Sequence, residues 1–168
     1  MNWANLYGTS ADSEYSGIAV IVGAMETGRR VVGKARELAD SLGCYVKVYG
    51  PASDWGLIGA DQVFSGGTIA KFLEQEKPEV VLLAPEAVLL EPVLRWAQKN
   101  SLAAIGPCFD VSIDISTREA AGRRTVMAGA MIADVGSTGK PQIFAMDVSR
   151  LPEPLTNPSR TATISALE

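Results

Sequence analysis

A chain of 168 residues, 47% hydrophobic and 20% charged, has the composition of one globular domain, which excludes wholesale disorder. Its formal net charge of -4 argues against a basic surface for binding nucleic acid. The absence of histidine excludes His-dependent catalytic triads, and the two cysteines are too few for a four-cysteine zinc site, so we expect reduced, packed thiols in a cytoplasmic protein.

The first part of the chain alternates between short apolar runs and amphipathic stretches. Residues 18–22 (IAVIV) form a continuous, largely β-branched run, which predicts a strand buried on both faces. Residues 28–42 place apolar side chains at spacings of three and four, which predicts a helix that stops at Gly43. Residues 44–49 and 62–64 are predicted to be the next two strands, joined by a loop that contains glycine and proline.

The middle of the chain continues this alternation of strands and helices. Thr68 is a good N-cap for a helix that runs through Glu76. Residues 79–84 (EVVLLA) predict the clearest buried strand. Residues 85–100 predict a further helix, which either begins at Pro92 or is kinked there.

The last third of the chain has a different pattern. Residues 101–105 are predicted to be one more strand of the parallel part, and residues 109–115 (FDVSIDI) alternate strictly between apolar and polar. We expect residues 124–133 and 142–148 to pair as an antiparallel hairpin across a turn at residues 136–139 (GSTG).

The order of these elements predicts the fold class and the division of the chain. Strands that alternate with helices favour a three-layer α/β/α, Rossmann-like domain of the adenine-nucleotide-binding type, with a mostly parallel, doubly wound sheet and an antiparallel C-terminal hairpin. We expect an N-terminal extension at residues 1–16 and a single α/β domain over residues 17–150. A Pro-, Ser- and Thr-rich tail at residues 151–168 is expected to be disordered or to lie as an arm on a neighbouring molecule. No secretory signal and no membrane-spanning run of about 20 apolar residues is predicted.

Three loops that follow predicted strands are the candidate binding segments. In a doubly wound sheet, ligands lie beyond the carboxyl ends of the strands, so these loops are expected to border one crevice. Residues 23–28 have the G-x-x-x-x-G spacing of a phosphate loop but lack the Lys-Ser/Thr that should follow, and Thr27 is alternatively a simple helix cap. Residues 65–68 either present backbone N–H groups to an anion or form a tight turn with an N-cap. Glu86 either binds a ribose hydroxyl or, as we favour, caps a helix N-terminus.

These loops supply the whole predicted site. The candidate cofactor-binding residues are Gly23, Ala24, Met25, Thr27, Gly28, Ser65, Gly66, Gly67, Thr68 and Glu86. We predict no catalytic residue and no metal ligand, because the chain offers few acid–base groups and no nucleophile beside a base. An enzyme is therefore the weakest of the functional hypotheses.

The order and spacing of the segments resembles the N-terminal domain of the electron transfer flavoprotein alpha subunit. The resemblance is carried by residues 33–43 (GKARELADSLG), by residues 59–64 (GADQVF), which are similar to the family's GAD-x-V strand, and by residues 77–83 (KPEVVLL). Residues 84–100, 102–113, 123–133 and 141–148 stand where the family has its later elements. The similarity spans about residues 17–152, and it rests on this order because no single motif is diagnostic.

The resemblance implies a non-catalytic module that binds or assembles around a nucleotide or flavin in electron transfer. FAD or AMP is expected to bind only together with a partner, either a beta-like subunit or a second copy of this chain as a homodimer; neither nucleic acid nor a membrane is an expected partner. Two departures limit the resemblance. The family's flavin-binding second domain has no counterpart in this chain, and its GAT-x-x-GRD loop is replaced by residues 84–92 (APEAVLLEP). The alternative is a stand-alone adenine-nucleotide-binding domain without a redox role.

Overall fold

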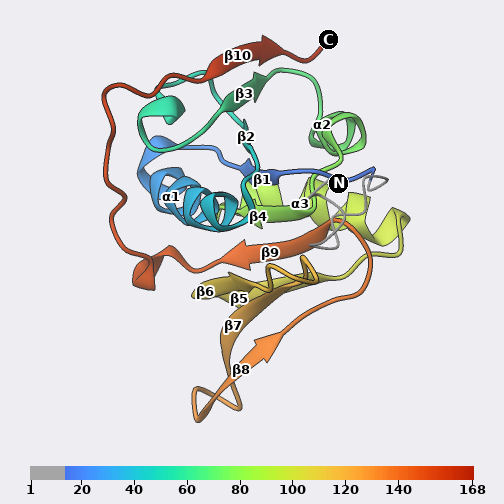
Figure 1. Ribbon diagram of the computed structural model, residues 1–168. Helices are drawn as coiled ribbons and strands as arrows, with labels where there is room; N and C mark the ends of the chain where they lie inside the picture. Colours follow the sequence, from blue (N-terminus) through green and yellow to red (C-terminus); the bar gives the residue numbers. More distant parts are fainter. Residues whose placement is uncertain (1–13) are drawn as a thin grey trace, which may run out of the picture.

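The computed structural model describes residues 14–168, so most of the predicted N-terminal extension lies outside the described residues (Figure 1). The centre of the fold is a seven-stranded sheet in which every neighbouring pair is parallel, in the order β10-β3-β2-β1-β4-β9-β5. Its strands are β1 (Ile18–Ile21), β2 (Val46–Tyr49), β3 (Gln62–Ser65), β4 (Val80–Leu83), β5 (Ala104–Cys108), β9 (Gln142–Met146) and β10 (Thr163–Ala166).

Helices cover both faces of this sheet, which confirms the predicted α/β/α layers. The helix α1 (Met25–Leu42) packs on one face, and α2 (Ile69–Glu76) and α3 (Ala87–Lys99) pack on the other. Two single-turn 3₁₀ helices, η2 (Trp55–Leu57) and η3 (Val148–Arg150), lie in connecting segments. None of the helices in the described part of the chain is long and apolar enough to span a membrane.

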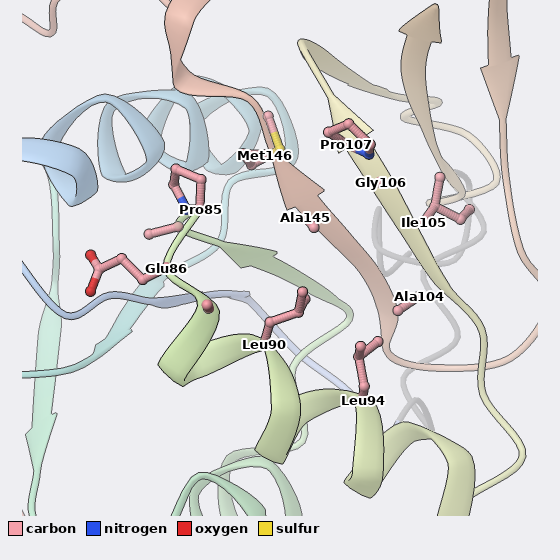
Figure 2. Close-up of a pocket in the computed structure, with 12 residues that line it drawn as sticks. Pro85, Glu86, Leu90, Leu94, Ala104, Ile105, Gly106, Pro107, Ala145 and Met146 are labelled. Carbon is pink, nitrogen blue, oxygen red and sulfur yellow. The ribbon is translucent and has the colours of Figure 1, made fainter. Parts of the chain in front are cut away.

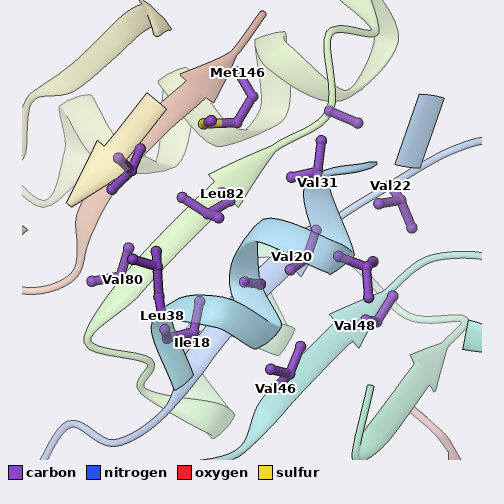
Figure 3. Packing of buried hydrophobic residues seen from close by; sticks show 14 of the residues in the cluster. Ile18, Val20, Val22, Val31, Leu38, Val46, Val48, Val80, Leu82 and Met146 are labelled. Carbon is purple, nitrogen blue, oxygen red and sulfur yellow. The ribbon is translucent and has the colours of Figure 1, made fainter. Parts of the chain in front are cut away.

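The core explains why the first apolar run is continuous. All four residues of β1 are 0% exposed, because side chains on both faces of this central strand meet a helix layer. Figure 3 shows one of the two faces, where Val31 and Leu38 of α1 lie over Ile18 and Val20.

The last third of the chain differs from the prediction. Residues 124–133 do not form one arm of a hairpin with residues 142–148. Instead, a separate antiparallel sheet contains β6 (Asp110–Ile113), β7 (Ala120–Val126) and β8 (Met131–Val135). Its β7–β8 turn contains Met127, Ala128 and Gly129, all with positive φ, and not the predicted glycines. The strand β9 joins the large sheet between β4 and β5, where its mostly buried residues are paired on both sides.

The small sheet lies on the α1 side of the large one. Gly122 of β7 lies so close to the large sheet that a Cβ there would be 2.5 Å from Cys108 Sγ and 2.7 Å from Phe144 Cδ1. The buried side chain of Gln142 joins the two sheets, because it accepts from Ala120 N at 2.7 Å and donates to Ala120 O at 3.0 Å. The chain between β5 and β9 therefore adds no helix to the α3 side of the large sheet.

The tail is neither disordered nor free for a neighbour, and that prediction is wrong. Residues 151–162 run along α1, where Glu153 bridges Arg29 at 2.6 Å and Arg30 at 3.0 Å. Residues 163–166 then form β10, which pairs with β3 at the edge of the large sheet (Figure 1). The tail thus completes the sheet of its own chain.

We expect Gln142→Leu to lower the free energy of unfolding by about 2–4 kcal/mol, because it strands the buried N–H and C=O of Ala120 without partners. Urea denaturation followed by circular dichroism measures this loss. The matched control is Gln75→Ala on the exposed side of α2, which should change stability by about 0.5 kcal/mol or less. Equal effects of the two variants would contradict the bridging role of Gln142.

Candidate functional site

The three predicted loops all lie at the carboxyl edge of the sheet, because the strands that they follow are parallel. The chain leaves β1 through α1 towards β2, whereas β4 lies on the other side of β1, so the strand order reverses between β1 and β4. Such a reversal opens a crevice where ligands commonly bind. The loops after β1 and β4 flank this crevice, while the loop at residues 65–68 lies two strands away, beyond β2.

Glu86 spans the crevice and occupies the position that a phosphate would take. Its Oε1 accepts hydrogen bonds from Ala24 N at 3.1 Å and from Thr27 Oγ1 at 2.6 Å. A Cβ on Gly23 would lie 1.9 Å from Glu86 Oε2, so the glycine makes room for this carboxylate. The Glu86 side chain therefore caps a helix N-terminus, as predicted. The helix is α1, however, and not α3, which follows Glu86 in the sequence.

The start of α1 explains why a distant carboxylate is needed there. The helix begins at Met25, three residues earlier than predicted, and its N-cap residue Ala24 has no side chain that accepts a hydrogen bond. Thr27 lies inside the first turn and is not the cap. Free N–H groups and the helix dipole favour a negative group at this end, and Glu86 supplies it from 59 residues away.

The other residues of the first loop serve packing. Gly28 is buried, and a Cβ there would lie 2.8 Å from both Trp55 Cη2 and Val22 Cγ1. Met25 packs against the apolar cluster under α1. A phosphate in this loop would have to displace the Glu86 carboxylate or remain beside its negative charge, which repels it.

The second loop is covered by the end of the tail. A Cβ on Gly67 would lie 2.8 Å from Leu167 Cβ, and Lys71 Nζ donates to the carbonyl oxygen of Glu168. Thr68 is the predicted N-cap of α2, since its hydroxyl accepts from Lys71 N at 3.2 Å. Gly66 and Gly67 have φ values of +78° and +60°, which a tight turn requires. Of the two interpretations, the turn with an N-cap describes residues 65–68.

An apolar pocket of about 510 Å³ lies next to the crevice, between α3 and the strands β9 and β5 (Figure 2). Small residues line its sheet side: Ala104 and Gly106 of β5 and Ala145 of β9. Leu90 and Leu94 of α3 line the opposite side. Because the connection from β5 to β9 runs on the α1 side, α3 is the element among the described residues that borders β9 and β5 on this side, and its flank lines the pocket.

Among the described residues that line the pocket, Glu86 is the titratable one, and its carboxylate points away from the pocket, towards α1 (Figure 2). Sequence reasoning missed this pocket because residues 142–148 were assigned to a hairpin, which separates them from residues 101–105. The available signal was the uninterrupted apolar run Ile143–Met146, which is typical of a buried parallel strand.

The two cysteines and the acidic side chains of residues 14–168 show the following chemistry. Burial raises the pKa of the Cys44 and Cys108 thiols, which leaves both as poor nucleophiles near neutral pH. Within residues 14–168 no group of three or more cysteine and acidic side chains gathers to hold a metal ion. The sequence matches no known family model, and no curated protein is significantly similar to it.

We expect Glu86→Ala to lower the free energy of unfolding by about 1–2 kcal/mol, because α1 loses its capping carboxylate. Thr27→Val removes the hydroxyl that donates to Glu86 Oε1, so it should also abolish the hydrogen bond between these two side chains. In a double-mutant cycle by urea denaturation, the two changes should show a coupling of about 0.5–1.5 kcal/mol.

The matched control for this cycle is Glu26→Gln, which removes an exposed charge from the same turn of α1. It should show no coupling to Glu86→Ala within the error of the measurement. Additive effects of Thr27→Val and Glu86→Ala would contradict the bridge across the crevice.

Proposed function

We propose that this chain is a non-catalytic binding module related to the electron transfer flavoprotein alpha subunit. Its apolar pocket takes the ring of a flavin or an adenine nucleotide, and a partner holds the phosphates. The observation that carries this proposal is the combination of an apolar pocket of about 510 Å³ with a phosphate-loop position already filled by Glu86.

The size and lining of the pocket support an uncharged ring as the ligand. Small-molecule sites are typically clefts of about 300–1,000 Å³ with mostly apolar walls. Leu90 and Leu94 offer aliphatic contacts to one face of a ring, and Ala104, Gly106 and Ala145 leave room for its other face. Within residues 14–168, no charged group of the lining points into this space to balance a phosphate.

The expected affinity of the chain alone is low. A ring system that buries about 150–250 Å² gains about 4–6 kcal/mol of hydrophobic free energy. Much of this gain is offset by the lost freedom of the ligand. A ring without phosphate contacts should therefore bind with a dissociation constant near the upper end of the micromolar range, and tight retention needs a partner.

The resemblance of residues 17–152 to the alpha subunit supports the choice of a flavin or adenine ring over other flat molecules. In that family the second domain binds most of the flavin dinucleotide, whereas residues 163–166 of this chain form β10 at the edge of the large sheet. A module of this kind needs phosphate contacts from another chain. A beta-like subunit or a second copy of this chain fits that role.

The alternative is a stand-alone adenine-nucleotide-binding domain without a redox role. The position of the crevice, where the strand order reverses between β1 and β4, favours it. It requires Glu86 to leave Ala24 and Thr27 so that a phosphate reaches the start of α1. The two proposals differ in what the phosphate contributes to affinity.

We expect riboflavin and FMN, and likewise adenosine and AMP, to bind the isolated chain with affinities equal within about threefold, since the phosphate finds no partner. Fluorescence titration for the flavins and calorimetry for the adenine compounds measure this. Ala104→Phe, which fills the pocket from β5, should abolish binding, whereas Thr125→Phe on the exposed side of β7 should leave it unchanged. A tenfold preference for the phosphorylated forms would favour the alternative, and no saturation below about 1 mM would contradict the ring site.

We also expect the isolated chain to purify without colour, because ring contacts alone do not retain a flavin through purification. An absorbance spectrum between 350 and 500 nm (roughly the visible flavin bands) checks this, and any bound flavin should dissociate on dialysis. Flavin retained at one per chain after dialysis would contradict the proposal that a partner must supply the phosphate contacts.

A further inference from the structure

We infer that the outer side of α3 is the interface between two copies of this chain, packed antiparallel about a two-fold axis. The inference adds to the proposed function by naming what covers the pocket. The test measures the oligomeric state of the chain without any ligand. A monomeric result would overturn the dimer but would leave the proposed binding of a ring by a single chain untouched.

The first observation is an exposed apolar groove along α3. Leu90 is 37% exposed and Leu94 42% exposed. A second hollow of about 540 Å³ lies along α3 and shares Ala87, Leu90 and Leu94 with the pocket. The two hollows therefore form one continuous groove that starts on the strands β9 and β5 and passes along α3.

The second observation is the spacing of the residues in this groove. Ala87, Leu90 and Leu94 follow one another at intervals of three and four, the spacing of the apolar positions in a heptad. This is the seam of a helix that packs lengthwise against another helix, with the knobs-into-holes contacts of a coiled coil. The small side chain of Ala87 and the small residues of β9 and β5 leave space beside the two leucines. A helix is therefore the shape that the groove fits.

The third observation is the charge pattern beside the seam, and it identifies the helix. Glu91 and Arg95 border the groove, with side chains 74% and 76% exposed, and they form an ion pair within α3 in which Arg95 Nη2 lies 2.5 Å from Glu91 Oε1. A second copy would add intermolecular pairs to this exposed pair. In an antiparallel pair centred between Pro92 and Val93, Glu91 of each copy approaches Arg95 of the other and Leu90 approaches Leu94, each pair lying half a residue from exact register. A parallel pair would set Glu91 against Glu91 and Arg95 against Arg95, which is repulsive.

Because one two-fold axis pairs both the leucines and the opposite charges, α3 is complementary to itself. Closed two-fold dimers use the same patch on both copies, which is what this pattern supplies. The interface of one helix and a sheet flank is small, so we expect a weak dimer with a dissociation constant on the order of 10 µM.

Sedimentation velocity of the full chain from about 1 to 200 µM should show a monomer–dimer equilibrium, a range that brackets the expected constant. Glu91→Arg and Arg95→Glu should each weaken the dimer at least tenfold, since each sets like charges opposite each other. The double variant Glu91→Arg/Arg95→Glu should restore dimerisation to near the original constant. Both side chains are mostly exposed, so the variants should keep the circular dichroism spectrum of the original chain.

The matched control is Glu119→Arg, which makes the same change of charge in the β6–β7 connection, on an exposed residue outside the groove. It should leave the dimer constant unchanged. A chain that stays monomeric at 200 µM (about 20 times the expected constant) overturns the inference, and the groove then belongs to a different protein. A dimer that survives both single reversals, or one that the double variant does not restore, also overturns it.

Discussion

The carboxylate of Glu86 lies at the start of α1, on the far side of the crevice from its own strand, and the ligand chemistry of the sheet edge depends on it. Because Ala24 cannot cap the helix, the charge has to come from another element, and β4 delivers it from the neighbouring position in the sheet. The same contact stabilises α1 and occupies the N–H of Ala24 and the hydroxyl of Thr27. One side chain therefore both caps α1 and places a negative charge in the crevice.

The route of the chain after β5 has a second consequence for binding. A right-handed connection from β5 back to β9 lies on the α1 side, where a regular doubly wound sheet would carry a helix. The chain instead builds β6, β7 and β8 on the α1 side, where Gln142 and Gly122 hold the two sheets together. The exposed flank that remains on the α3 side supplies both the pocket and the groove.

Local patterns were enough to predict the parallel core, and distant contacts were not predictable. The run at residues 18–22 and the cap at Thr68 carry their signals within a few residues, so β1 and α2 were placed correctly. The strand β9 was misplaced because the glycines at residues 136–139 favoured a hairpin over a return to the large sheet. The role of Glu86 depends on residues 59 and 62 positions away, and no spacing within its own loop shows which helix it reaches.

The position of β9 also bears on how this molecule acquires its structure. It is the neighbour of both β4 and β5 but is synthesised after them and after the whole small sheet. Until residues 142–146 arrive, β5 has no partner strand in the large sheet. Pairing between segments so far apart in sequence closes long loops and is slow. The nascent chain therefore passes through a stage in which its first four strands can assemble while the following 40 or so residues remain a target for aggregation and for chaperones.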